Sequence, residues 1–187
     1  MKYGAATVNG VISASAEALY AIVSDVKRHV EMAGSGQVQT VEWVTSPPVQ
    51  TGSRFKARQK MGVEYDTKSV VVVCEPNRAF VWFSGPTGDP PFGEYWGFEF
   101  EPLDAGRTRV FHGMCVPIGL PNLPPFTWIA NAGAQHEVGN MQPTYQKLAQ
   151  MAGGKLEGEL AVVMAPLCSL RPMLSLNGDP CGSVKAN

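Results

Sequence analysis

The chain lacks any apolar run that approaches the roughly 20 residues a helix needs to cross a bilayer. Residues 1–8 also lack the apolar segment of a secretory signal peptide, which predicts that the protein is not exported. The four cysteines show no CxxC spacing, so the usual cysteine signature of a zinc or redox site is absent. We therefore expect a cytoplasmic protein in a reducing compartment, without integral membrane association.

Strong net charge is missing as well. The formal net charge is −1, and the densest basic run, residues 54–60, alternates its cations along one predicted strand. That pattern is typical of the solvated outer face of a sheet, so no nucleic-acid partner is expected. With 44% hydrophobic and 17% charged residues, the 187-residue chain has the composition of one globular domain with a core of its own.

Recognisable catalytic motifs are absent too. The sequence has no G-x-S-x-G elbow, no HExxH pair and no glycine-rich phosphate loop. Its histidines, His29, His112 and His136, are scattered and do not make a metal site. We predict no metal and no cofactor, and the lack of a catalytic constellation favours a protein that is not an enzyme.

The centre of the chain contains a succession of β-branched and aromatic runs. Four such runs, punctuated by Pro, Gly, Asn and Asp, predict an antiparallel meander over residues 65–74, 79–83, 95–101 and 107–116. In the third run Trp96, Phe98 and Phe100 share one face, and Glu99 and Glu101 share the other. One face of this sheet should therefore be wet, and the other must be covered.

The segments before the meander supply further strands and two short helices. They are, in order, a strand over 7–13, a helix over 16–23, a short helix or turn over 26–32, and strands over 38–45 and 52–60. Ser15 is a suitable N-cap for the first helix because its hydroxyl can accept from a free backbone N–H.

The segments after the meander are a helix and a tail. From Phe126 the apolar residues recur at helical spacing as far as Leu148, which predicts one long C-terminal helix. Pro143 lies inside it and should kink or split it near Asn140. Residues 152–187 are rich in Gly and Pro and are predicted to form a weakly ordered tail. A segment that folds over an exposed edge or over a pocket mouth is the alternative.

Together these elements predict an α+β helix-grip fold. It consists of a curved seven-stranded antiparallel sheet wrapped around the long C-terminal helix, with two short helices after the first strand. Gly62, Gly97 and Gly113 are positions where the sheet could bend. Such a sheet leaves an elongated apolar cavity of roughly 300–1,000 Å³, the size that holds small molecules.

Several stretches resemble the SRPBCC superfamily of START-like helix-grip proteins, in particular its polyketide cyclase/dehydrase and lipid-transport group. The stretches that carry the likeness are residues 11–20, 23–25, 52–55, 71–78, 96–102, 106–110 and 140–148. The resemblance covers residues 5–151, so residues 1–151 would form the ligand-binding domain and 152–187 a tail. It implies binding of lipids, sterols, polyketides or quinones, with catalysis in some members.

Alternation along the strands predicts which side chains point into the cavity. The predicted ligand-binding residues are Phe55, Gln59, Tyr65, Thr67, Ser69, Phe80, Trp82, Trp96, Phe98, His112, Met114, Met141 and Tyr145. For each aromatic residue, packing in the core is the alternative. Asp89 and Glu94 flank the Pro-rich loop and could sit at the pocket mouth, although loop carboxylates are usually solvated.

His112 and Tyr65 are the candidates for catalytic roles. His112 lies in a predominantly apolar strand, where burial would keep its imidazole neutral and able to bond a ligand or move a proton. A structural histidine satisfied by a neighbouring strand or by the final helix is the alternative. His29 follows Lys27 and Arg28 and is expected to be solvated, and His136 should be exposed at the edge of the helical stripe.

Three hypotheses for the function follow. The first is a carrier or sensor of a small hydrophobic molecule that is lipid-, polyketide- or sterol-like. The second is a polyketide cyclase or dehydratase in which His112 or Tyr65 moves protons. The third is a protein-interaction module, which would need a large exposed apolar patch. Convergence of His112 and Tyr65 on one point would favour the enzyme. The sequence defines neither the ligand nor the oligomeric state.

Overall fold

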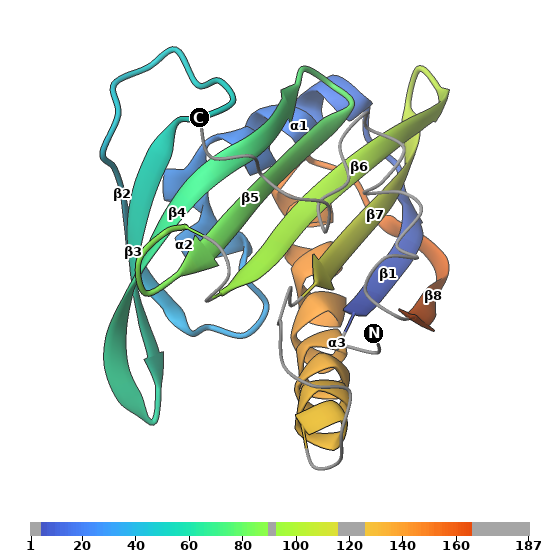
Figure 1. Ribbon diagram of the computed structural model, residues 1–187. Coiled ribbons are helices and arrows are strands. Elements are labelled where there is room, and N and C mark those ends of the chain that lie inside the picture. Colours follow the sequence, from blue (N-terminus) through green and yellow to red (C-terminus); the bar gives the residue numbers. More distant parts are fainter. Residues whose placement is uncertain (1–4, 90–92, 116–125, 166–187) are drawn as a thin grey trace.

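The computed structural model describes residues 5–89, 93–115 and 126–165. Within these ranges the fold is α+β, with one eight-stranded antiparallel sheet in the order β2-β3-β4-β5-β6-β7-β1-β8 (Figure 1). The strands are β1 (Ala5–Ile12), β2 (Val38–Trp43), β3 (Arg54–Met61), β4 (Val63–Glu75), β5 (Ala79–Gly85), β6 (Glu94–Asp104), β7 (Arg107–Cys115) and β8 (Leu156–Ala165). The helices are α1 (Ala16–Ser24), the 3₁₀ turn η1 (Val26–Arg28), α2 (His29–Met32) and α3 (Phe126–Met151).

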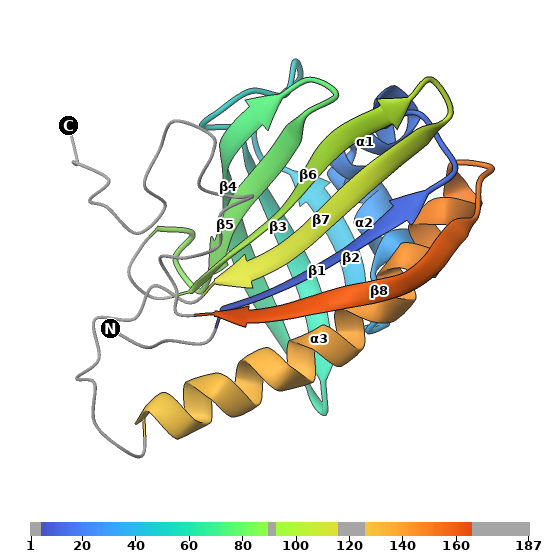
Figure 2. The same ribbon diagram turned by 90° about the vertical axis from the view of Figure 1, so that its right-hand side faces the viewer.

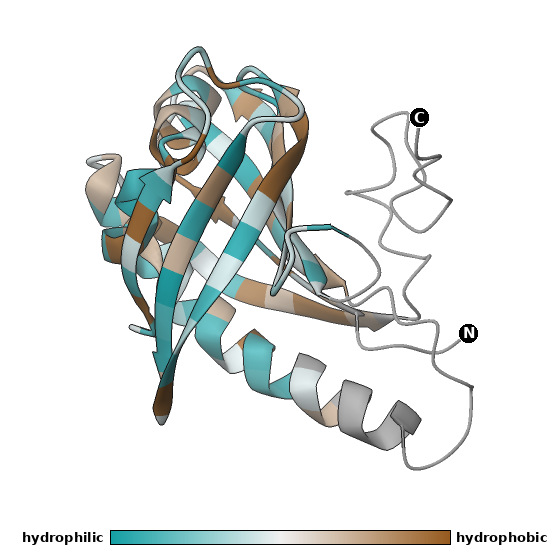
Figure 3. Ribbon diagram, turned by 60° about the vertical axis from the view of Figure 1, so that its left-hand side comes forward, coloured by the Kyte–Doolittle hydropathy of each residue, from teal (hydrophilic) through white to brown (hydrophobic). Residues whose placement is uncertain are grey.

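The predicted order of elements as far as the long helix is confirmed. Ser15 caps α1 as expected, since its Oγ accepts from the backbone N–H of Ala18 at 3.2 Å. All the helices contribute to one core with the inward face of the sheet, through Leu19 of α1, Met32 of α2 and Leu148 of α3. Figure 2 shows α3 crossing beneath the sheet beside β8 and β1. Hydrophilic and hydrophobic residues alternate along the strands (Figure 3), as a sheet with one covered face requires.

The predicted number of strands was wrong, because residues 156–165 form β8. This segment was assigned to a weakly ordered tail, but it pairs with the outer edge of β1 from Ala5↔Ala165 to Ile12↔Leu156. The glycines within and just before this strand are required by the local geometry and do not indicate disorder. Gly158 has a φ of 70° near the register shift between β1 and β8, and a Cβ on Gly154 would clash with the carbonyl oxygen of Ser13. Residues 166–187 lie outside the described part of the chain.

Pro143 does not split the long helix. α3 is one helix over 26 residues with Pro143 inside it. The next residue, Thr144, donates from Oγ1 to the carbonyl oxygen of Asn140 at 3.0 Å and accepts from the backbone N–H of Gly34 at 2.9 Å. The helix is therefore supported at its weak point by the loop between α2 and β2, which offsets part of the cost of the missing backbone donor.

Tyr145 attaches α3 to the sheet. Its side chain is fully buried, and its hydroxyl donates toward two carbonyl oxygens, that of Val8 on β1 at 2.6 Å and that of Val110 on β7 at 2.9 Å. Burial raises the pKa of Tyr145 well above its ordinary value, so the hydroxyl keeps its proton. One side chain thus connects the helix to two neighbouring strands.

A second apolar cluster lies on the opposite face of the sheet. Val70, Phe83, Tyr95 and Cys115 face one another across β4, β5, β6 and β7 in one row. The last three are only 0–3% exposed. The expectation that this face is wet was therefore wrong over part of its area.

Among the described helices, none is long and apolar enough to cross a membrane.

Replacing Tyr145 by Phe should destabilise the fold while keeping its ring in place. The two carbonyl oxygens lose their donor, and we expect a loss of about 1–3 kcal/mol in the free energy of unfolding. Urea unfolding measures it. Tyr65→Phe is the control, because Tyr65 is an exposed residue whose hydroxyl bonds Gln59 alone among the described residues. This variant should change stability by less than about 0.5 kcal/mol. Equal stabilities for the two variants would contradict the role of Tyr145.

Gly34→Ala should also destabilise, because Gly34 lies against the backbone of α3. An added Cβ would come within 2.5 Å of the carbonyl oxygen of Asn140 and 2.6 Å of the backbone nitrogen of Thr144. We expect a cost of about 1–3 kcal/mol in urea unfolding. Gly133→Ala, in the same helix with open space around it, is the matched control and should stabilise by up to about 1 kcal/mol. A neutral Gly34→Ala would show that the loop does not hold the helix.

Candidate functional site

A cavity of about 260 Å³ lies between the inner face of the sheet, the segment from α2 to β2, and the middle of α3. It is somewhat smaller than the predicted range, because large aromatic side chains such as Trp82, Trp96 and Phe98 take up part of the space. One end is lined by Met61 and Tyr65, which are 55% and 36% exposed. This end is the mouth, and the opposite, inner end is lined by buried residues.

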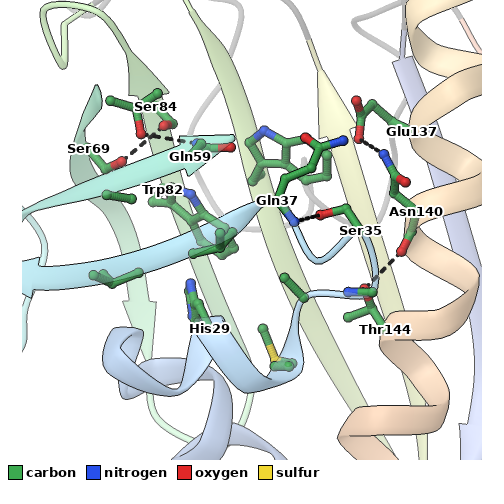
Figure 4. A pocket seen from close by; sticks show the side chains of 18 of the residues that line it. His29, Ser35, Gln37, Gln59, Ser69, Trp82, Ser84, Glu137, Asn140 and Thr144 are labelled. Atoms are coloured by element: carbon green, nitrogen blue, oxygen red, sulfur yellow. Dashed lines mark hydrogen bonds between the residues drawn. The ribbon is translucent and has the colours of Figure 1, made fainter. Parts of the chain in front are cut away.

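A polar row runs across the sheet along one wall of the cavity. Strand register places Ser69, Ser84 and Glu94 side by side on β4, β5 and β6, and the apolar Phe55 of β3 lies beside Ser69 at the end of this row. Ser69 donates to Ser84 at 3.1 Å, so these buried hydroxyls satisfy each other (Figure 4). The wall is therefore apolar only in part, and Ser69, one of the predicted lining residues, contributes a hydroxyl to it.

His112 lines the inner end of the cavity from β7. Its Nδ1 lies 3.0 Å from the carbonyl oxygen of Gly97, and because a carbonyl only accepts, Nδ1 carries the proton and Nε2 is an acceptor. The ring stacks on Phe98 with centroids 3.9 Å apart. Burial lowers the pKa of His112 to about 4, the bond to Gly97 opposes this shift, and the nearby His29 adds to it. His112 is thus uncharged at neutral pH.

His29 faces the same cavity from α2, and the expectation that it is solvated was wrong. It is 6% exposed, because the turn η1 directs Lys27 and Arg28 outward and the next residue inward. Its Nε2 lies 2.7 Å from the carbonyl oxygen of Val23, which leaves Nδ1 as the acceptor. The ring centroid lies 5.0 Å from that of Trp82. Burial lowers the pKa of His29 to about 4, although the hydrogen bond to Val23 opposes this shift.

Two carboxylates lie near the mouth. Glu137 of α3 accepts from the side-chain amide of Asn140 at 2.9 Å (Figure 4). Glu94 of β6 accepts a hydrogen bond from the side chain of Trp96. Burial raises the pKa of Glu94, the bond from Trp96 opposes this, and the charge of Glu137 raises the pKa further. Tyr65 lies in the field of both carboxylates, and burial together with their charge raises its pKa.

The two candidates for catalysis do not share a partner. The hydroxyl of Tyr65 donates to Gln59 at 3.3 Å near the mouth, and Gln59 in turn donates to Thr67 at 3.2 Å. His112 bonds the backbone at the inner end. The structure therefore brings both residues to one cavity, at its two ends, and no hydrogen bond in the described ranges links them.

Most of the predicted ligand-binding residues line this cavity. They are Phe55, Gln59, Tyr65, Thr67, Ser69, Trp82, Trp96, Phe98, His112 and Met141. Phe80, Met114 and Tyr145 instead pack in the core outside the cavity lining, the first two beneath α1 and against β1, and the third against the strands it bonds. Their predicted ligand contacts are therefore not supported by their positions.

Several lining residues were not predicted from the sequence. Besides His29, they include polar residues of α3 and four loop residues: Glu137, Asn140, Thr144, Ala33, Gly34, Ser35 and Gln37. The loop residues fall between the elements predicted over 26–32 and 38–45, and the polar residues of α3 lie off its apolar stripe. Of the two loop carboxylates, Glu94 lines the cavity, while Asp89 is exposed and pairs with Arg54 at 3.0 Å. His136 is exposed as expected.

Metal ligands do not gather in the part of the chain that the structure covers, since no three His, Cys, Asp or Glu side chains there could hold an ion. Cys74 and Cys115 form no disulfide within the described residues.

Comparison with known protein sequences gives a partial match. No family model matches the chain. It is 37% identical over 100 residues to the uncharacterized protein Rv0088 of Mycobacterium tuberculosis strain H37Rv, a stretch that covers 53% of this chain and 42% of that protein. The chain thus spans about two fifths of the curated relatives it matches.

Comparison with solved structures shows the fold. The aromatase/cyclase Zhui from Streptomyces sp. R1128 matches with a TM-score of 0.59 and 13% identity over 80% of this chain and 93% of that one. The protein TTHA0849 from Thermus thermophilus matches with a TM-score of 0.58 and 16% identity over 79% of this chain and 96% of that one. At such identities the likeness concerns the fold alone, which is of the helix-grip type that Zhui also has.

Lowering the pH should destabilise the protein through the two buried histidines. Between pH 6.5 and 4, His29 and His112 bind protons in the unfolded chain but remain unprotonated in the folded protein. The free energy of unfolding therefore falls as the pH is lowered through this range. The loss should reach about 3 kcal/mol for each histidine and is absent above pH 6.5. Urea unfolding over this pH range measures it.

His112→Gln should flatten this pH dependence, because Gln does not titrate. The exposed His136→Gln is the matched control and should leave it unchanged. Carboxylates titrate in the same range in all three proteins, so the difference between the curves isolates the histidine. Parallel curves for wild type and His112→Gln would contradict the buried, neutral state of His112.

Proposed function

We propose that this protein is of the SRPBCC type and binds a small, ring-containing molecule in its cavity, as a carrier or sensor. The observation that carries the proposal is a cavity between sheet and helix whose aromatic walls are interrupted by buried polar groups. Trp82, Trp96 and Phe98 offer flat apolar surfaces, and His29 and His112 each present a hydrogen-bond acceptor. Pockets of this composition orient a mostly apolar ligand through a few polar contacts.

The size and polarity of the cavity favour one kind of ligand among those considered. A volume of about 260 Å³ suits a molecule of two or three fused rings better than a sterol or a long acyl chain. A purely apolar lipid would leave the acceptors on His29 and His112 without a partner, at a cost of about 1–3 kcal/mol for each group. An oxygenated, polyketide-like ring system satisfies both requirements.

Apolar burial supplies enough free energy for such binding. At about 25 cal/mol per Å², covering roughly 200 Å² of ligand surface contributes about 5 kcal/mol before any hydrogen bond forms. One or two hydrogen bonds of about 1 kcal/mol each would bring the dissociation constant to the micromolar range. No covalent chemistry is needed.

A cyclase or dehydratase is the second candidate. The fold likeness to the aromatase/cyclase Zhui and the available Nε2 of His112 favour it. The separation of Tyr65 and His112 to opposite ends of the cavity favours the carrier or sensor. In the carrier, His112→Ala weakens binding of the co-purifying molecule, identified by native mass spectrometry, without abolishing it. Complete loss of a measured turnover in that variant would establish the enzyme instead.

Filling the cavity should weaken ligand binding while leaving the fold intact. Ala57 lines the cavity from β3, so the side chain in Ala57→Phe would occupy the ligand's space. We expect the neutral fluorescent probe N-phenyl-1-naphthylamine to bind the wild type, and the variant to bind it at least about tenfold more weakly.

The exposed turn residue Ala105 provides the control, since Ala105→Phe adds the same bulk far from the cavity. It should bind the probe like the wild type. Unchanged binding by Ala57→Phe, or no binding by the wild type, would overturn the proposed site.

A further inference from the structure

The ionisable groups among the described lining residues include acidic residues but no lysine or arginine. Glu94 and Glu137 line the mouth of the cavity. The two histidines at the inner end are held neutral by burial. In the described lining, all formal charge is therefore negative.

Neither carboxylate is neutralised by a cation within the described ranges. The ion pairs found there join other residues, on the outer surface. Among the described residues, Glu137 and Glu94 receive hydrogen bonds from the neutral donors Asn140 and Trp96. The carboxylates repel each other, because the charge of Glu137 opposes ionisation of Glu94. A cation placed beside them would relieve this repulsion.

The inner end of the cavity also requires donors. His29 and His112 are 6% and 5% exposed, and each donates its one ring N–H to a backbone carbonyl oxygen. The remaining ring nitrogens, Nδ1 of His29 and Nε2 of His112, have no partner in the part of the chain described here. A ligand O–H or N–H can satisfy them, whereas a ligand carbonyl or carboxylate cannot.

We propose that the cavity selects ring-containing molecules that carry a protonated amine, held by Glu94 and Glu137 at the mouth, and a hydrogen-bond donor at the inner end. It discriminates against carboxylates, and so against fatty acids and other acidic lipids. This inference rests on the proposed function, since it names the ligand class of the same site. It follows from charge complementarity, because an anion entering this mouth gains no cation and meets two like charges.

The test compares three naphthalenes that differ only in one group. Isothermal titration at neutral pH would measure 2-naphthylmethylamine, 2-naphthylmethanol and 2-naphthoic acid, which are cationic, neutral and anionic. We expect the amine to bind at least about fivefold more tightly than the alcohol, since a partly exposed ion pair contributes about 1 kcal/mol. The acid should bind more weakly than the alcohol.

Glu94→Gln/Glu137→Gln should bring the affinities for amine and alcohol to within about twofold. Each single variant should give an intermediate ratio, which keeps the test valid if the double variant does not fold. Glu17→Gln/Glu159→Gln is the control, because both glutamates are exposed outside the cavity, and it should keep the wild-type ratio.

The outcomes separate this inference from the proposed function. If the alcohol binds but the amine binds no more tightly, or the acid binds best, the charge selection is wrong and the cavity still holds ligands. If none of the three binds the wild-type protein, the proposed function itself fails. A preference for the amine that persists in the double variant would place its ammonium group elsewhere.

Discussion

The contact between Tyr145 and two strands determines where α3 lies. The hydroxyl bonds the backbones of β1 and β7 in the C-terminal half of the helix. Met141, Tyr145 and Leu148 are fully buried there, whereas residues 132, 133, 135 and 136 are exposed. Among the side chains that are described, those that pack α3 against the sheet belong to its C-terminal half. The cavity lies against the middle of the helix, where Glu137, Asn140 and Thr144 line it.

The same geometry explains why the cavity is polar. The middle of α3, where the helix leaves the core, carries Glu137, Asn140 and Thr144, which a fully buried helix could not accommodate without partners. The loop around Gly34 closes the gap between α2 and this part of α3, through the hydrogen bond from its backbone to Thr144. The polar row through Ser69 and Ser84 faces them across the space. A site of mixed polarity results from one helix that is only partly packed.

Strand alternation and helical spacing predicted much of this arrangement from the sequence. They identified the meander, the gripping helix and ten of the residues that line the cavity, because burial of one face leaves a period of two in strands and of 3.6 in helices. They failed where tertiary contacts override local pattern. β8 was missed because Gly154 and Gly158 resemble disorder in sequence but serve a close turn and a bulge. His29 was missed because basic neighbours suggested solvent.

Sequence pattern also could not separate the cavity from the core. Phe98 and Phe80 are neighbours on adjacent strands and face the same way, yet only Phe98 lines the cavity. The difference depends on how far α1 and α3 reach over each residue, which no local period encodes. Likewise, the apolar row on the opposite face, with Phe83 and Tyr95, contradicts the simple rule of one wet and one covered face.

The central claim is that a guest molecule occupies the space between the sheet and α3. The three histidines allow a direct measurement, because His29 and His112 line that space and His136 is exposed. Nitrogen NMR of the imidazole rings during titration with 2-naphthylmethanol would report on all three at once. The account predicts that the signals of His29 and His112 shift while that of His136 stays. A shift of His136 alone, or of none, would contradict it.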